Sequence, residues 1–182
     1  MGTGLPAFMA AAGVVVSSVA FAAPAVSCAP HAAAPAGAMQ QIAPAAIRWA
    51  QSRSEEAVAQ GAPLSPRLVE IARQVGVRHP DRVRIQVVDR IELPDEPTLK
   101  AAAAEVGLVP ASAGGMTLGY GIVIVRGEES GLRLLSHELR HVAQYEEAGG
   151  IGPFLARHIP DLMRYGYRDS PYERDARAHE AR

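Results

Sequence analysis

Hydrophobic and polar positions divide the chain into a leading segment without charged residues and a longer part in which the two kinds of position alternate. The first charged residue is Arg48, and residues 8–22, FMAAAGVVVSSVAFA, are almost wholly apolar. This run has the size of the apolar region of a signal peptide, and the AFA triplet at 20–22 fits a cleavage pattern. The segment therefore predicts a signal peptide over 1–22 and an exported bacterial protein, periplasmic or secreted, with a disordered Ala/Pro tail as the alternative.

The same apolar run is too short and too interrupted for a membrane span. Gly13, Ser17 and Ser18 break it and Pro24 follows it, and it falls short of the ~20 residues that cross a bilayer. We therefore expect no transmembrane helix here.

After an Ala/Pro-rich linker at 23–38, the pattern predicts one domain over 39–182. Most of this part has the apolar spacing of amphipathic helices, two stretches have the spacing of strands, and no internal repeat is visible. This order of elements predicts an α+β fold. The expected helices are 39–61, interrupted near Pro44, then 65–77, 98–108, the stretch around 134–148, 151–167 and 170–182, and the expected strands are 81–93 and 116–127.

The stretch LLSHELRHVAQYEEAGG at 134–150 contains a His-Glu-x-x-His pattern, formed by His137, Glu138 and His141. Four residues are close to one helical turn, so both imidazoles lie on one face and can bind a single Zn²⁺. The glutamate beside the first histidine can exchange a proton with a zinc-activated water. The alternative is an amphipathic helix with two idle histidines, but the pattern rarely arises by chance.

The surroundings of the motif favour the zinc interpretation. Leu135, Leu139 and Val142 form a stripe beside the histidine face, which predicts a buried helix. Ser130 is expected to cap its start, and two glycines follow its end.

A catalytic zinc site needs a third protein ligand, for which the residues after the motif offer several candidates. The candidates after the motif are His158, Asp161, Asp169, Glu173, Asp175, His179 and Glu180. Glu173 is preferred, because it lies in the first turn of a helix that Ser170 and Pro171 are suited to start. Asp175 and His179 remain the main alternatives. A metzincin is excluded, because no histidine follows at the spacing that this class requires.

These residues resemble those of a zincin of the gluzincin type, an HExxH zinc metallopeptidase. The stretch HELRHVAQY…FLARHIPDLMRYGYRDSPYERDAR is similar to small bacterial minimal zincin domains, and the resemblance covers roughly residues 80–180. In those domains a phrase N-P-x-E-x-E-A supplies the third ligand, and SPYERDA matches it with Ser170 for Asn and Asp175 for the second Glu. The resemblance implies a minimal zincin-like fold with a small sheet and an active-site helix packed against C-terminal helices. It also implies that Glu173 binds zinc, and that TLGYGIVIV is an edge strand to which a peptide substrate adds.

Two positions depart from the pattern of this class. Arg140 lies inside the motif, where we expect it to face solvent or to pair with Glu146 or Glu147. Arg177 stands where thermolysin-like enzymes have an aspartate that orients a histidine, so a different residue must do this. Tyr165, Tyr167 and Tyr172 are candidates for stabilising the oxyanion.

Composition narrows the choice of partners. The net charge is −1, so no excess of positive charge would attract nucleic acid or an anionic membrane. The single cysteine, Cys28, excludes an internal disulfide and a cysteine zinc site, and its AVSC context loosely matches a lipoprotein box. We therefore expect Zn²⁺ as the cofactor and a peptide or protein as the substrate. A non-catalytic zinc-binding module and an amidase of cell-wall peptides are the alternatives.

Overall fold

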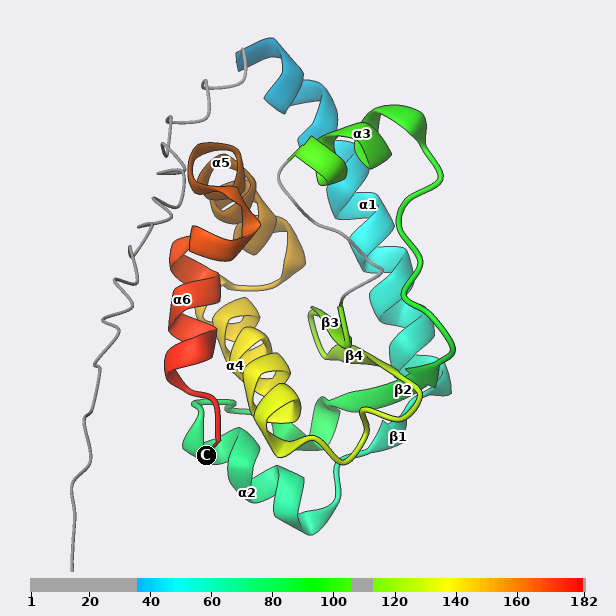
Figure 1. The fold of residues 1–182 in the computed structure, drawn as a ribbon, viewed down its shortest axis with the longest axis vertical. Helices are drawn as coiled ribbons and strands as arrows, with labels where there is room; N and C mark the ends of the chain where they lie inside the picture. Colours follow the sequence, from blue (N-terminus) through cyan, green and yellow to red (C-terminus); the bar gives the residue numbers. More distant parts are fainter. Residues whose placement is uncertain (1–35, 106–112, 182) are drawn as a thin grey trace, which may run out of the picture.

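Figure 1 shows the fold in a computed structural model, which describes residues 36–105 and 113–181. The expected signal peptide and Cys28 lie outside the described residues and stay predictions. The α+β class is confirmed. The helices are α1 (Ala36–Gln60), α2 (Pro66–Gln74), α3 (Pro97–Glu105), α4 (Leu132–Ala148), α5 (Ile151–Asp169) and α6 (Pro171–Ala178), a 3-10 turn η1 covers Pro80–Arg82, and the strands are β1 (Ala62–Pro63), β2 (Arg84–Val88), β3 (Gly115–Leu118) and β4 (Gly121–Val125).

The four strands form one mixed sheet in the order β1-β2-β4-β3. The central pair, β2 and β4, is parallel, whereas β1 and β3 pair antiparallel with their neighbours. A parallel pair needs a long crossover connection, and here α3 and β3 lie in it. Within the described residues, β3 forms one edge of the sheet.

Helices cover both faces of this sheet. The larger core lies between the strands and the pair α2 and α4, and it contains Val83, Ile122 and Leu139, each fully buried. The opposite face is covered by α1, where Ala57 packs with Val123. Figure 1 shows α6 alongside α4 on the side away from the sheet, whereas α5 packs against α1 as well as against α4 and α6. The helix α4 is thus enclosed by other elements, as its apolar stripe predicted.

Several sequence expectations about helices are confirmed. In α2, the Ser65 side chain accepts a hydrogen bond from the Leu68 N–H and Pro66 occupies the first turn.

The expected interruption of the first helix is wrong, because α1 continues through Pro44. It also begins at Ala36, so the last residues of the expected linker are helical.

The expected strand at 116–127 is a hairpin of two strands. Gly119 has a φ of +63° and lies in the two-residue turn between Leu118 and Gly121, which pair with each other. Glycine adopts this left-handed conformation without steric penalty. The stretch TLGYGIVIV is therefore not one edge strand: β4 is central, and only β3 lies at the edge.

The expected strand at 81–93 is shorter than predicted. Only Arg84–Val88 forms β2, and η1 precedes it. Val83 is buried, as the alternation predicted, but Gln86 on the other side is also buried and bonds to Gln60 at the end of α1. Val87, which the alternation placed on the same side as Val83, is 37% exposed, so the simple inside–outside alternation does not hold.

None of the helices in the described part of the chain is long and apolar enough to cross a membrane.

Candidate metal centre

The helix α4 places His137, Glu138 and His141 in the interior of the molecule. Leu135, Leu139 and Val142 are at most 2% exposed and fix the helix against the sheet and α2. The helix ends at Gly149, whose φ of +94° is the left-handed cap typical of a helix end. At its start the residue that caps the helix is Gly131, without a side-chain bond, so the expectation for Ser130 is wrong.

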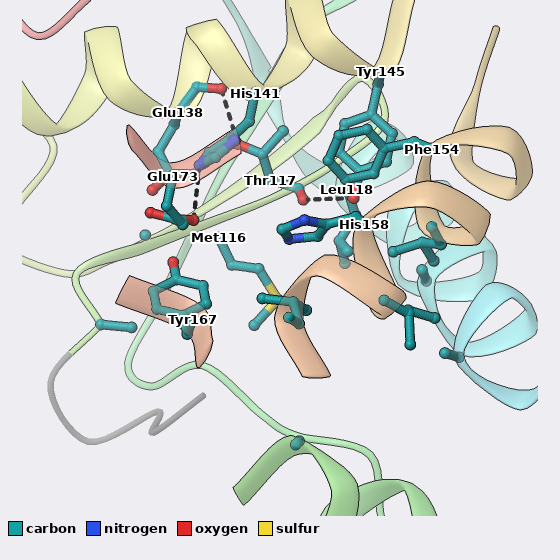
Figure 2. Close-up of a pocket in the computed structure, with 18 of the residues that line it drawn as sticks. Met116, Thr117, Leu118, Glu138, His141, Tyr145, Phe154, His158, Tyr167 and Glu173 are labelled. Atoms are coloured by element: carbon teal, nitrogen blue, oxygen red, sulfur yellow. Dashed lines mark hydrogen bonds and ion pairs between the residues drawn. The ribbon is translucent and has the colours of Figure 1, made fainter. Parts of the chain in front are cut away.

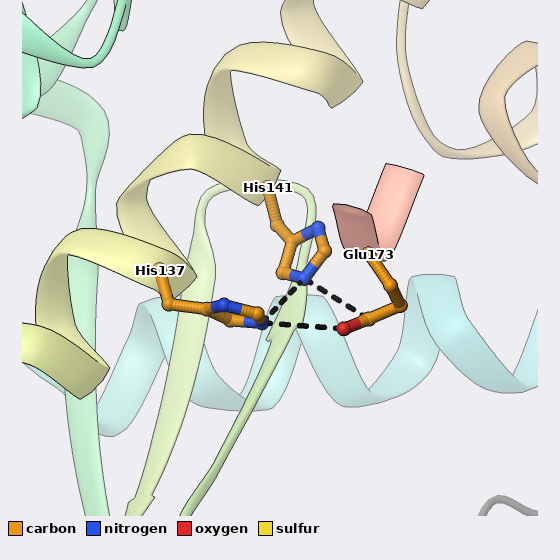
Figure 3. Close-up of side chains that lie close together, drawn as sticks. All are labelled: His137, His141 and Glu173. Atoms are coloured by element: carbon orange, nitrogen blue, oxygen red, sulfur yellow. Dashed lines mark hydrogen bonds and ion pairs between the residues drawn. The ribbon is translucent and has the colours of Figure 1, made fainter. Parts of the chain in front are cut away.

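Three side chains converge on one point beside α4 (Figure 3). The Nε2 atoms of His137 and His141 lie 3.1 Å apart. Glu173 places one carboxylate oxygen 3.4 Å from the first Nε2 and the other 3.2 Å from the second. Ligands at ~2.0–2.1 Å around a tetrahedral zinc lie roughly 3.3–3.4 Å from one another. The spacing of these three groups therefore fits a zinc ion.

Glu173 reaches this point because α6 folds back along α4. The Ser170 side chain accepts a hydrogen bond from the Glu173 N–H at 3.2 Å, which caps the helix as expected. Ala176 is fully buried, and its small side chain allows α6 to approach closely. The Glu173 side chain is 4% exposed, and Arg177 lies 3.5 Å from its carboxylate.

The charges of the three groups depend on one another. Burial alone would raise the pKa of Glu173, but its contacts with His137 and His141 outweigh this and hold the pKa well below its usual range. For His141, burial would lower the pKa, yet the nearby carboxylates of Glu173 and Glu138 raise it. The site thus provides a carboxylate that is ionised at neutral pH, directed at two imidazoles.

The other ring nitrogens of the two histidines are also held. Nδ1 of His141 lies 2.8 Å from Oε1 of Gln144, and Nδ1 of His137 lies 3.2 Å from Oε1 of Glu180. In each pair the oxygen can accept the Nδ1 hydrogen, which leaves Nε2 free to bind a metal. Glu180, a minor ligand candidate in the sequence, therefore takes the orienting position that the aspartate missing at Arg177 would fill.

Asp175 and Arg140 form a polar network behind His141. Nε of Arg140 donates to Asp175 at 2.6 Å, and the Gln144 side-chain amide donates to the same carboxylate at 2.7 Å. Arg140 also donates to Glu147 at 2.8 Å. The expected pairing with Glu147 is confirmed, whereas the partner Asp175 was not foreseen. Asp175 contacts the residue that holds His141 and lies outside the metal group.

Among the remaining candidates in the described residues, His158, Asp161, Asp169 and His179 do not join the metal group. Nδ1 of His179 lies 2.8 Å from the Asp175 backbone carbonyl oxygen. His158 is buried with Phe154 and Tyr172, at ring distances of 5.0 and 5.1 Å. Burial lowers the pKa of His158 to about 4, so its ring is uncharged at neutral pH.

The motif glutamate is positioned by the edge strand β3. The Thr117 hydroxyl lies 2.7 Å from Oε2 of Glu138 and 3.0 Å from its backbone oxygen, so it can donate to either. At Gly115, an added Cβ would lie 2.8 Å from Oε1 of the same carboxylate. Gly115 lies just outside the strand expected at 116–127, and no local pattern marked Thr117 as a contact of the motif. Only the pairing of β3 with β4 reveals that both face Glu138.

A cavity of about 590 Å³ opens beside the three converging groups (Figure 2). Glu138 and Tyr167 line it, and the Tyr167 hydroxyl points toward Glu173. Burial and the nearby carboxylates raise the pKa of Tyr167, so it stays protonated and can donate a hydrogen bond. Tyr165 is 42% exposed and does not line the cavity. Of the three candidate tyrosines, Tyr167 has the position for contact with a substrate.

A bend in α5 sets the position of Tyr167. Gly166 has φ 72° and ψ 168°, a conformation that is essentially restricted to glycine, and it interrupts the helix just before the tyrosine. The apolar spacing predicted an uninterrupted helix over 151–167. The signal that was overlooked is the glycine between two tyrosines.

In the comparisons with known proteins, a family model described as the eCIS core domain matches residues 88–149. That family is a zincin-like, metallopeptidase-associated one. The match covers about a third of the chain, from the end of β2 to the end of α4, and does not reach Glu173. No curated protein and no solved structure matches the chain.

Proposed function

We propose that the protein is a zinc-dependent peptidase in which His137, His141 and Glu173 hold the metal. The observation that carries this proposal is the convergence of three ligand groups, in which one ligand atom from each residue lies within 4.8 Å of the others and each imidazole Nε2 lies 3.2–3.4 Å from a carboxylate oxygen of Glu173. Two imidazoles and one carboxylate are also a donor set that zinc accepts in catalytic sites, which keep a fourth position open.

The chemistry follows from the groups around that point. Bound zinc would polarise the scissile carbonyl and make a water molecule more acidic. Glu138 accepts the proton of the attacking water and returns it to the leaving amine. Thr117 holds the carboxylate of Glu138 toward the cavity. Tyr167 donates a hydrogen bond to the carbonyl oxygen as negative charge develops on it.

The placement of Glu138 supports a catalytic role over a purely structural zinc site. A structural site needs only ligands, whereas Glu138 is buried, held by a threonine hydroxyl and directed at the cavity without being a ligand. An amidase acting on cell-wall peptides would use the same groups, and only the substrate separates the two activities.

Metal analysis together with the Glu138→Gln variant tests the proposal. The wild-type protein should hold one zinc per chain and hydrolyse peptides. The variant should hold the same zinc but lose hydrolysis, because it lacks the proton acceptor. Wild-type protein that binds no zinc would contradict the metal assignment. Zinc-loaded wild-type protein that hydrolyses neither peptides nor cell-wall amides would favour the binding module instead.

A further inference from the structure

The cavity beside the metal group has two chemically different ends. All of its charged lining residues come from α4, α6 and the turn after α6: Arg133, Glu138, Glu173, Arg177 and Glu180. The walls supplied by α1, α3 and α5 carry no charged group at neutral pH, because the one titratable histidine there, His158, is uncharged. The cavity thus leads from a charged reaction site into an apolar chamber, which we define as the part lined by α1, α3 and the portion of α5 before Tyr167.

The chamber walls are built from large apolar side chains. Ile42 and Trp49 come from α1, Leu99 from α3, and Leu155 and Leu162 from α5. A charged side chain that entered here would lose its water without gaining a partner, whereas an apolar one would be favoured by leaving water. His158 adds no charge, and its buried Nδ1 has no hydrogen-bond partner among the described residues.

The dimensions favour large side chains over small ones. The whole cavity, of which the chamber is one end, has a volume of about 590 Å³, within the range of pockets that enclose whole small ligands, so even an aromatic side chain can enter it. A small side chain would leave most of the walls without contacts. Met116 and Leu118 on β3 also line the cavity, so the chamber is continuous with the edge strand and with Glu138.

We propose that this chamber binds a large apolar side chain of the substrate next to the scissile bond, so that the enzyme selects peptides with Leu, Met, Phe or Trp at that place. The inference rests on the proposed peptidase function, because it assumes that the bond to be cleaved lies at the metal group. It adds the substrate class and assigns its recognition to α1, α3 and α5, which lie outside the metal group.

Binding and cleavage can be measured separately. Zinc-loaded Glu138→Gln protein binds without cleaving and can be titrated with short peptides that differ only in one central residue: Leu, Phe, Asp or Lys. Trp49, the only tryptophan of the chain, lines the chamber and reports occupancy by its fluorescence. We expect the Leu and Phe peptides to bind about 10- to 100-fold more tightly than the Asp and Lys peptides. Equal affinities would overturn the proposal.

Substitutions that fill the chamber provide the structural control. Ala46→Phe on α1 should weaken binding of the Phe peptide about tenfold or more while zinc content and circular dichroism stay unchanged. Val58→Phe lies on the same helix at an exposed position outside the chamber and should change nothing. If Ala46→Phe misfolds, Ala103→Phe on α3 makes the same test from another wall. The proposal would be overturned if a folded chamber variant bound the Phe peptide as tightly as the Glu138→Gln protein without that substitution.

Cleavage of a peptide mixture by the wild-type protein then separates the proposed peptidase function from the proposed role of the chamber. Cleavage sites flanked by large apolar residues support both. Cleavage without any such preference leaves the peptidase function standing and overturns the chamber assignment. Tight binding of apolar peptides without any cleavage supports the chamber as a binding site and contradicts the proposed hydrolysis.

Discussion

The two imidazoles of the candidate metal centre are each held at both ring nitrogens. Their Nε2 atoms face Glu173, while their Nδ1 atoms face Glu180 and Gln144. A ring held in this way has a fixed orientation and tautomer before the metal arrives, which favours binding. The residues that contact the two imidazoles therefore have one of two roles, as a further ligand or as support for a ligand, and substitutions should separate these roles.

Loss of the ligand Glu173 should weaken zinc binding more than loss of the support Glu180. Glu180→Gln removes the charge from the Nδ1 partner of His137, and we expect a zinc affinity about 10-fold lower, within the ~10–100-fold range typical of residues that orient a ligand. Glu173→Ala should exceed that range. Competition with a chelating dye measures the zinc dissociation constants of both variants. Equal losses would mean that Glu173 is not a ligand.

The hydroxyl of Thr117 should matter for turnover and not for metal binding. Thr117→Val removes the hydrogen bond to the Glu138 carboxylate, and we expect kcat/KM to fall about 10- to 100-fold with unchanged zinc content. Thr117→Ser restores a hydroxyl at the same place and should keep most of the activity. An unaffected Thr117→Val enzyme would show that Glu138 is positioned without this bond.

Among the elements, the C-terminal end of α4 is fixed by a buried carboxylate. Glu146 accepts hydrogen bonds from the backbone N–H groups of Arg78 and His79 at 2.6 and 3.0 Å, and from the Tyr120 hydroxyl at 3.0 Å. These bonds join α4 to the segment before η1 and to the hairpin turn. The element that carries the motif is thereby tied to the sheet at the end opposite to its first histidine.

Glu146→Ala should destabilise the fold much more than the neighbouring change Glu147→Ala. The first leaves two backbone donors unsatisfied, for which we expect a loss of about 2–4 kcal/mol in the free energy of unfolding. The second removes an exposed carboxylate from Arg140, which keeps its hydrogen bond to Asp175, and should cost less than about 1 kcal/mol. Urea denaturation monitored by circular dichroism compares them. Similar losses in the two variants would contradict the assigned role of Glu146.

The elements were predictable from the sequence where the signal is local. Caps such as Ser65 and Ser170 and the buried stripe of α4 depend on neighbouring residues, so the pattern gives them directly. The hairpin at Gly119 was missed, because a continuous apolar run does not reveal where it reverses direction. The contacts of Thr117 and Glu180 were missed for another reason: they join residues 21 and 43 positions apart, and no local period encodes such contacts.

Across the whole molecule, the metal group joins two helices that are separated by the whole of α5. His137 and His141 lie on α4 and Glu173 on α6, so an ion bound by all three links these helices in the folded state only. A ligand that binds the folded state alone stabilises it by mass action, by about 2.7 kcal/mol at a concentration of 100 times Kd. The fold and the proposed cofactor should therefore be thermodynamically coupled.

Removal of zinc should lower the melting temperature of the wild-type protein. Calorimetry with and without a chelator measures the difference, and the Glu173→Ala variant is the control, in which chelation should have little effect. A chelator effect of equal size in both proteins would show that the metal is bound elsewhere.

The stabilisation by zinc should also decrease as the pH falls. In the metal-free protein burial would lower the pKa of His141, but the nearby carboxylates raise it above its ordinary value, so protonation of the ring competes with metal binding as the pH falls. The pKa of Glu173 is lowered, so this carboxylate stays ionised throughout the range. We expect a larger zinc-induced shift in melting temperature at pH 8 than at pH 6. An equal zinc-induced shift in melting temperature at both pH values would contradict competition between protons and zinc for His141.

The two ends of the cavity come from different stretches of the chain. The groups proposed for bond cleavage lie on β3 and on the helices α4 to α6, whereas much of the apolar chamber comes from α1 and α3, which precede them in the sequence. Recombination within a gene exchanges contiguous stretches. A recombination breakpoint between α3 and β3 would therefore replace two walls of the chamber and leave the reactive groups intact. Proteins descended from one such ancestor can then differ in substrate preference while they keep the same reaction.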